Sequence, residues 1–215
     1  MRMVLLGPPG SGKGTQAVRL ASKYEIPAIS TGDMFRQAVR NRTPVGRLAK
    51  TYMDQGLLVP DDVTIAAVKE RLLAGDAGKG FILDGFPRSI EQATALDSIL
   101  KESGCALEVV VSLEVPEDLL IRRAAGRRVC KCGATYHVTN DPPKVEGKCD
   151  LCGGPLLHRK DDTREVVAER LKTYAEKTEP LKAYYRLQGI LLEVDGSGSI
   201  EHSSLMVDKA LEMFF

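Results

Sequence analysis

The sequence predicts an α/β fold in which a mostly parallel sheet is flanked by helices and interrupted by two insertions. Three observations predict it. Short apolar runs alternate with helical sequence along the chain, which is typical of a parallel sheet with helical crossovers. The first run ends in a glycine-rich motif at residues 7–13. Two segments, roughly 30–59 and 127–160, do not fit the alternation and are interpreted as excursions from the sheet.

The strands are expected where apolar runs of three to five residues are bounded by turn or helical sequence. These runs lie at residues 4–6, 81–83, 109–113 and 190–194. Helices are expected at residues 13–24, 31–41, 45–55, 61–74, 89–102, 116–123, 162–189 and 200–214, where apolar positions recur at helical spacing. Their starts carry suitable caps, such as Asp61 or Asp62, and Ser89 with Gln92 three residues later.

Length and composition indicate a single soluble domain with insertions. The 215 residues are 43% hydrophobic and 27% charged, which excludes disordered and fibrous proteins. Lys and Arg (30) nearly balance Asp and Glu (29), so the net charge offers no attraction to nucleic acid or to an anionic membrane. The N-terminus runs directly into the glycine motif, and no stretch approaches the ~20 apolar residues of a membrane span. We therefore expect a cytoplasmic protein that binds neither nucleic acid nor membrane.

The glycine-rich motif indicates a site for nucleoside triphosphates. Gly7-Pro-Pro-Gly-Ser-Gly-Lys13 matches G-x-x-x-x-G-K and lies between the first expected strand and helix, as this motif requires. Its backbone N–H groups and the helix N-terminus bind phosphate oxygens, and the lysine adds a charge at the β- and γ-phosphates. Gly14 replaces the usual Ser or Thr, and the hydroxyl follows at Thr15. We therefore do not expect this loop to ligate Mg²⁺ directly.

A second group of charged residues suits phosphoryl transfer. Asp84 ends an expected strand, where a carboxylate can hold Mg²⁺ or its bound water, although Asp-Gly also forms ordinary turns. Arginines recur where elements end or loops begin: Arg36, Arg88, Arg123, Arg127, Arg128, Arg159 and Arg170. A transferred phosphoryl group needs several guanidinium groups around it because its charge spreads over many oxygens. The three histidines are scattered and indicate no nucleophilic site.

Four of the five cysteines lie within 23 residues and predict a structural zinc site. Cys130, Cys132, Cys149 and Cys152 provide a complete tetrahedral set of thiolates, which leaves no open position for a substrate. Glycine follows each pair, as expected where the chain turns sharply around a metal. Two alternatives stay open, because the C-x-C pair forms a tight chelate. The thiols are unligated, or His137 or Asp150 replaces Cys130.

Taken in order, the motifs closely resemble those of the adenylate kinases. They are Gly7 to Thr15, Ile29-Ser-Thr-Gly-Asp-Met34, Asp84-Gly-Phe-Pro-Arg88, Gly126-Arg-Arg128, Asn140 to Gly147, Lys160-Asp-Asp162 and Val194-Asp-Gly196. The resemblance covers essentially the whole chain. Within the family, the chain is similar to the long-lid, zinc-bearing bacterial type. It implies a monomer with a P-loop core (1–29, 60–126 and 165–215), an AMP-binding segment (30–59) and a lid (127–164). The implied reaction is reversible transfer of the γ-phosphoryl group of Mg-ATP to AMP.

The resemblance also implies a role for individual residues. The phosphates of ATP would be bound by Gly10, Ser11, Gly12, Lys13, Gly14 and Thr15. Further ATP contacts would come from Arg127, Thr135, Tyr136 and Gly198. AMP would be bound by Thr31, Arg36, Leu57, Leu58, Val59, Gly85, Phe86, Pro87, Arg88, Gln92, Arg159 and Arg170. The charge-stabilising shell would consist of Lys13, Arg88, Arg123, Arg127, Arg159 and Arg170, with Asp84 orienting hydrated Mg²⁺. The chain departs from the zinc-bearing relatives at Cys130-Lys-Cys132, where they have C-x-x-C, and its loop Ser197-Gly-Ser199 is unlike theirs.

Two other functions share parts of this pattern. A kinase for UMP, CMP or GMP would have the same core, but Thr31 and Gln92 favour AMP because an amide pairs well with adenine. A zinc-ribbon protein that binds nucleic acid would use the same cysteines. The near-zero net charge and the 5% aromatic content argue against that function.

Overall fold

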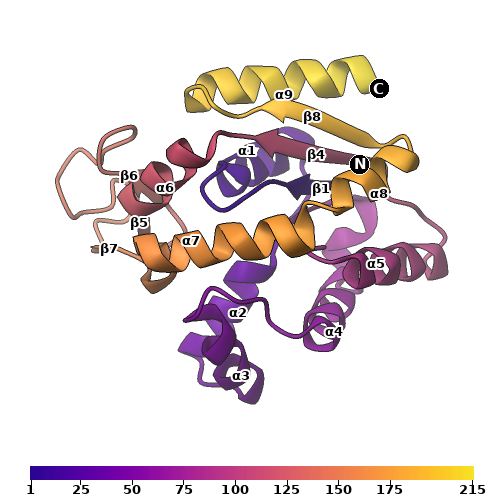
Figure 1. Cartoon of the computed structure of the whole chain (residues 1–215), viewed down its shortest axis with the longest axis horizontal. Helices are drawn as coiled ribbons and strands as arrows, with labels where there is room; N and C mark the ends of the chain where they lie inside the picture. Colours follow the sequence, from indigo (N-terminus) through magenta and orange to yellow (C-terminus); the bar gives the residue numbers. More distant parts are fainter.

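The computed structural model describes residues 1–215 and contains a five-stranded parallel sheet. Its order is β2-β3-β1-β4-β8, with the first strand of the chain at the centre (Figure 1). The strands are β1 (Arg2–Leu6), β2 (Ala28–Ser30), β3 (Phe81–Asp84), β4 (Val109–Glu114) and β8 (Leu191–Asp195). All four expected strands are present, and the α/β fold with a parallel sheet flanked by helices is confirmed.

The central strand is apolar on both faces because helices cover both faces of the sheet. Successive side chains of a strand point to opposite faces. In β1, Met3 and Leu5 pack against α1 (Lys13–Tyr24) and α9 (Ile200–Phe214). Val4 and Leu6 face the layer formed by α4 (Asp61–Leu72), α5 (Ile90–Glu102) and α8 (Leu181–Leu187). All four side chains are at most 3% exposed. Two hydrophobic cores of this kind fix the position of the loop that follows β1.

The remaining helices connect the strands or belong to the two insertions. Their bounds are α2 (Thr31–Arg40), α3 (Pro44–Met53), α4 (Asp61–Leu72), η1 (Gly75–Lys79), α5 (Ile90–Glu102), α6 (Glu117–Gly126), η2 (Lys160–Asp162), α7 (Arg164–Thr173), η3 (Tyr174–Thr178) and α8 (Leu181–Leu187). In Figure 1, α2 and α3 project away from the sheet below α7. None of the helices is long and apolar enough to span a membrane.

The second insertion contains a small sheet that the sequence patterns did not predict. Strands β5 (Arg127–Cys130), β6 (Thr135–His137) and β7 (Leu156–Leu157) form an antiparallel sheet in the order β6-β5-β7. It lies beyond the ends of α6 and α7 in Figure 1. These strands are two to four residues long and have few large apolar side chains, so no periodicity marks them.

Two local expectations were wrong. The helix predicted over 162–189 is divided into α7, the π-helical turn η3 and α8. In the π-helical turn, the Glu179 N–H donates to the Tyr174 carbonyl five residues earlier. Helix α8 begins directly after Pro180, which has no N–H to donate. The first helical turn of α4 is not capped by Asp61 or Asp62, because Pro60 occupies the cap position. By contrast, Ser89 caps α5 as predicted, by accepting from the N–H of Gln92.

Candidate nucleotide site

The loop between β1 and α1 has the geometry of a phosphate cradle. Gly10 and Gly12 have φ of 86° and 97°, which side-chain-bearing residues rarely adopt. A Cβ added at Gly10 would lie 2.6 Å from the Leu120 carbonyl oxygen, so the loop also needs glycine for close packing. The first turn of α1 has no side-chain cap and no acidic residue. Its N–H groups are therefore available to an anion.

Lys13 folds back across this loop. Its Nζ donates to the carbonyl oxygens of Gly7 at 2.6 Å and Pro8 at 2.9 Å. Burial lowers the pKa of Lys13 to about 7, an effect that Asp84 opposes and the neighbouring arginines Arg88, Arg170 and Arg127 strengthen. A phosphate group that took the place of these neutral carbonyls would give the Lys13 ammonium an anionic partner and so favour its charged form.

Asp84 lies beside the start of α1 because β1 and β3 are adjacent parallel strands, with Leu5 in register with Asp84. A Cβ added at Gly14 would lie 3.7 Å from Asp84 Oδ2. A carboxylate at this position, with phosphate oxygens and water as its partners, is a donor set that suits Mg²⁺. The residues present therefore fit a hydrated Mg²⁺ ion that the nucleotide shares.

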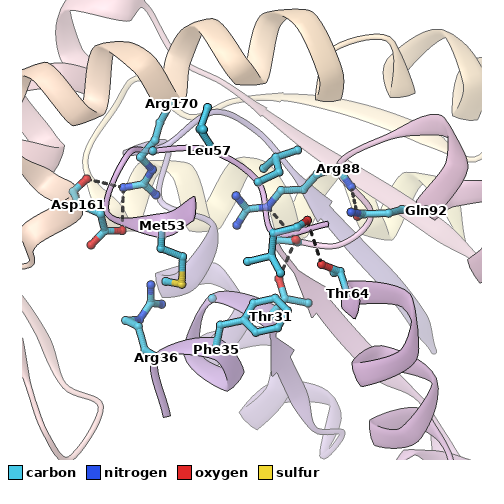
Figure 2. A pocket seen from close by; sticks show the side chains of 15 residues that line it. Thr31, Phe35, Arg36, Met53, Leu57, Thr64, Arg88, Gln92, Asp161 and Arg170 are labelled. Atoms are coloured by element: carbon cyan, nitrogen blue, oxygen red, sulfur yellow. Dashed lines mark hydrogen bonds and ion pairs between the residues drawn. The ribbon is translucent and has the colours of Figure 1, made fainter. Parts of the chain in front are cut away.

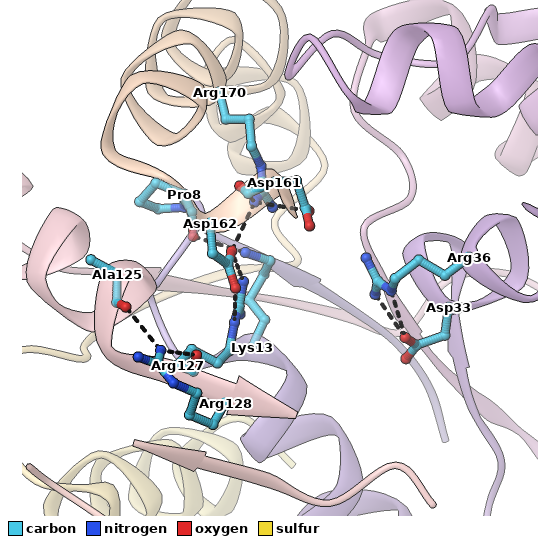
Figure 3. Close-up of polar contacts among 10 residues, drawn as sticks. All are labelled: Pro8, Lys13, Asp33, Arg36, Ala125, Arg127, Arg128, Asp161, Asp162 and Arg170. Carbon is cyan, nitrogen blue, oxygen red and sulfur yellow. Dashed lines mark hydrogen bonds and ion pairs between the residues drawn. The ribbon is translucent and has the colours of Figure 1, made fainter. Parts of the chain in front are cut away.

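Two arginines converge on one buried carboxylate close to Lys13 (Figure 3). Arg127 donates to both oxygens of Asp162 at 2.8 and 2.5 Å, and Arg170 Nη1 lies 3.3 Å from Asp162 Oδ1 and 3.1 Å from Asp161 Oδ2. Asp162 is fully buried. Although burial opposes it, this pairing holds the pKa of Arg127 above its usual value. The contact joins the small sheet to α7.

Other arginines are half-buried with fewer anionic partners. Arg88 Nε donates only to the Gly85 carbonyl at 2.8 Å, and burial together with Arg170 lowers the pKa of Arg88 to about 10. Arg159 has a buried Nε with no hydrogen-bond partner, and burial together with Arg36 lowers the pKa of Arg159 to about 10. Such unbalanced positive charge, partly removed from water, is suited to a polyanionic ligand.

A cleft that is partly open to solvent lies beside Arg88 and Arg170 (Figure 2). Among the predicted AMP contacts it is lined by Thr31, Arg36, Leu57, Leu58, Val59, Gly85, Arg88, Gln92 and Arg170. Thr31 donates to the Gly85 carbonyl at 2.8 Å, which ties the start of α2 to the end of β3. A second cleft continues to the P-loop and includes Lys13 and Pro87.

Several predicted contacts lie elsewhere. Phe86 is fully buried in the hydrophobic core and lines neither cleft. Arg123 donates to the carbonyls of Gly196, Ser197 and Gly198 at 2.7 to 2.8 Å and so holds this loop in place. Thr135 is exposed, whereas the Tyr136 hydroxyl accepts from the Asp150 N–H at 2.8 Å and faces the cysteines.

The four clustered cysteines form a compact group in the second insertion. Their Sγ atoms all lie within 4.8 Å of one another, with Cys130 and Cys152 at 3.4 Å and Cys132 and Cys149 at 3.6 Å. A tetrahedral ion with Zn–S bonds of about 2.3 Å separates its sulfurs by about 3.8 Å, so this donor set fits zinc. The Tyr136 hydroxyl lowers the pKa of Cys149 to about 6, which favours the thiolate.

The two alternative ligands are not part of this group. His137 Nδ1 accepts from the N–H groups of Thr139 and Asn140, and Asp150 Oδ1 accepts from the Lys144 N–H. The structure therefore brings together the four predicted cysteines and not a mixed set.

Some residues of the site were missed from the sequence. Asp161 and Asp162 were noted only as part of a motif, yet they pair with the predicted arginines. Thr178 donates to the Arg88 carbonyl at 2.9 Å from the π-helical turn, and Asp61 accepts from Gln92. The only signal for Asp61 was an acidic pair at a helix start, which is usually a capping signal.

Known proteins are similar to this chain in sequence over its full length. Residues 5–190 match the family described as adenylate kinase. An adenylate kinase of Carboxydothermus hydrogenoformans is 54% identical over 213 residues, which are 99% of this chain and all of that protein. One of Moorella thermoacetica is 55% identical over 98% of both chains, and one of Methanothrix thermoacetophila is 50% identical over the whole of both. Together with the P-loop fold, these matches show that the chain belongs to the adenylate kinase family.

Proposed function

We propose that this protein transfers the γ-phosphoryl group of Mg-ATP to AMP, reversibly, and forms two ADP by direct in-line transfer. The observation that carries the proposal is the convergence of Lys13 and the arginines between the phosphate cradle and the cleft. No cysteine or histidine lines either cleft, which is consistent with transfer between two bound nucleotides. Charge neutralisation and alignment then supply most of the catalysis.

Each part of the site has a chemical task. The P-loop amides and Lys13 bind the phosphates of ATP, and Thr31, Gln92 and the 57–59 segment bind AMP in the cleft beside Arg88. Asp84 holds the hydrated Mg²⁺, which when bound neutralises phosphate charge. Arg123, Arg127, Arg159 and Arg170 face the phosphate chain once both nucleotides are present. For Arg127 and Arg170, this requires the phosphates to compete with Asp161 and Asp162. For Arg123, it requires the guanidinium to leave the carbonyls of Gly196, Ser197 and Gly198.

The two insertions act as covers of the site. We assign residues 30–59 to an AMP-binding segment and 127–164 to a lid over ATP, with the rest of the chain as the core. Their closure excludes water, which would otherwise accept the phosphoryl group. The four cysteines hold a structural zinc ion in the lid, which has only a three-residue apolar cluster as its core.

A coupled assay of ADP formation from ATP and AMP tests this function. We expect ADP to form only when both nucleotides are present. Lys13→Met removes the charge at the β- and γ-phosphates and should lower turnover by several orders of magnitude. The control is Lys23→Met, at the other end of the same helix, where the side chain pairs with Asp208 on the surface. Normal turnover in a folded Lys13→Met protein would contradict the proposed role of the P-loop.

A further inference from the structure

The side-chain amide of Gln92 is held in one of its two orientations by two groups of fixed polarity. The backbone N–H of Arg88 donates to Gln92 Oε1 at 2.7 Å, and Gln92 Nε2 donates to Asp61 Oδ1 at 2.7 Å. A backbone N–H can only donate and an ionised carboxylate can only accept. The two neighbours therefore identify which end of the amide is oxygen and which is nitrogen. Gln92 is 1% exposed and lines the cleft.

Asp61 holds Gln92 from behind the cleft. It lies in the first turn of α4, whereas Gln92 lies in the first turn of α5, so the contact joins the starts of two helices. Its second oxygen accepts from the Ser89 hydroxyl at 2.6 Å, which keeps the carboxylate in place. Asp61 does not line the cleft. It can therefore act on a ligand only through Gln92.

Rotating the Gln92 amide by half a turn would be costly in this setting. The NH₂ group would then face the N–H of Arg88, and the oxygen would face the carboxylate of Asp61. Two hydrogen bonds of a buried group would be replaced by a donor–donor contact and an acceptor–acceptor contact. The amide is thus restricted to one orientation before any ligand binds.

The donor and acceptor positions that the protein leaves free on this amide can pair with a purine. An amide has two N–H donors and an oxygen that accepts twice, and the structure uses one donor and one acceptor site. Adenine presents an acceptor at N1 beside a donor at its 6-amino group, whereas hypoxanthine presents a donor at N1 beside an acceptor at O6. If one amide orientation matches adenine, the reversed orientation matches hypoxanthine. A free glutamine would rotate and accept both bases.

We propose that Asp61 is a specificity-determining positioning residue, which locks Gln92 in the orientation that pairs with adenine and so excludes 6-oxopurine nucleotides. The inference rests on the proposed function, because it takes AMP as the acceptor. Its observation is independent of the P-loop and of the arginine side chains, because Arg88 contributes only its backbone N–H. It requires only the two fixed-polarity contacts on a buried amide at the cleft wall.

The test compares AMP with IMP, which differ only at N1 and at position 6. Asp61→Asn keeps the shape of the side chain, but its amide can present either oxygen or NH₂ to Gln92, which releases one half of the lock. We expect the ratio of kcat/KM for AMP to kcat/KM for IMP to fall at least about tenfold, or ~1.4 kcal/mol, mainly through a gain with IMP. Asp61→Ala should lower the ratio in the same direction. The matched control is Asp62→Asn, an exposed neighbour in the same helical turn, which should leave the ratio within about twofold.

The outcomes separate this inference from the proposed function. A purely structural role for Asp61 would lower both kcat/KM values together, and an unchanged ratio in both Asp61 variants would overturn the inference. Thermal unfolding identifies any variant that is not folded. If one Asp61 variant is unfolded, the AMP to IMP ratio of kcat/KM is measured in the other Asp61 variant. Wild-type protein that forms no ADP with AMP would instead contradict the proposed function. Wild-type preference for IMP over AMP would contradict the assigned orientation.

Discussion

Lys13 forms hydrogen bonds with its own loop, but its surroundings disfavour the charged ammonium. Three oxygens of residues 7, 8 and 11 contact its Nζ, yet all three are neutral, and burial lowers the pKa of Lys13 to about 7. The ligand-free protein therefore holds a cation in a place that favours its neutral form. In the proposed function, a bound phosphate would remove this penalty and so contribute to nucleotide binding.

The lowered pKa predicts a pH-dependent stability. Between pH about 7 and the ordinary lysine value of 10.5, the unfolded chain keeps a proton that the folded chain has lost. Unfolding then takes up a proton, so the stability of the ligand-free protein rises with pH in this window. Relative to Lys13→Met, the wild type should gain up to ~1.4 kcal/mol per pH unit above pH 7 and change little below it. Urea unfolding of both proteins at pH 6, 8 and 9.5 measures this; a pH-independent difference would contradict it.

Arg88 differs from Lys13 because it belongs to the wall shared by both clefts. We predict that Arg88→Ala lowers kcat at least ~100-fold, since a well-placed donor to the developing charge contributes about 2.7–4 kcal/mol. The matched control is Arg186→Ala, a surface arginine that pairs with Glu193. Steady-state kinetics with both nucleotides varied give the result. A rise in the KM for AMP alone would assign Arg88 to binding only.

At the scale of elements, the second insertion is stabilised by few apolar contacts. Its apolar cluster consists of Cys130, Tyr136 and Cys149, so two of its three members are themselves zinc-ligand candidates. Arg127 pairs with Asp162 within the insertion, and Arg170 of α7 connects Asp161 and Asp162 to the core. A metal ion held by the four cysteines would add further order to this segment.

Zinc removal should therefore affect stability more than chemistry. We expect metal analysis to find one zinc ion per chain, and chelation to lower the Tm by several degrees with a smaller effect on the rate at low temperature. Cys105→Ser, which changes the one cysteine outside the group, should retain the zinc. Less than ~0.2 zinc per chain after refolding with excess zinc would contradict the site.

The elements differ in how far they could be predicted. The four core strands were recognised because helices cover both faces and leave uninterrupted apolar runs. Strand β2 and the strands of the insertion were not, because they are only two to four residues long, and β2 and β7 pair with strands that are distant in sequence. The residues of the P-loop and of the cleft could be predicted because they lie in short motifs that can be recognised in the sequence. The contacts of Asp61, Asp162 and Thr178 depend on which helices meet, which the sequence pattern does not specify.

At the scale of the whole molecule, the site lies between parts that are joined by few connections. Segments α2–α3 and β5–β7 both extend from the same sheet, and the predicted phosphate contacts come from all three parts (Figures 1 and 3). A site of this kind is complete only when the parts approach one another.

Binding of a bisubstrate analogue that spans both nucleotide sites should bring both segments toward the core. Labels at Thr51, Glu146 and Lys209 are exposed and report on the AMP segment, the lid and α9. We expect the distances from Lys209 to the other two positions to shorten, whereas a Lys101–Lys209 pair within the core should not change. Distance measurements that show no shortening would contradict the assignment of the two covers.

Direct transfer between two bound nucleotides is tested most directly by following the phosphate itself. With ATP labelled at the γ-phosphate and unlabelled AMP, the label should appear at the β-position of ADP, with two ADP formed for each AMP consumed and no inorganic phosphate released early in the reaction. Label in inorganic phosphate at a rate that AMP does not change, or label retained on the protein as an intermediate, would contradict the proposed mechanism.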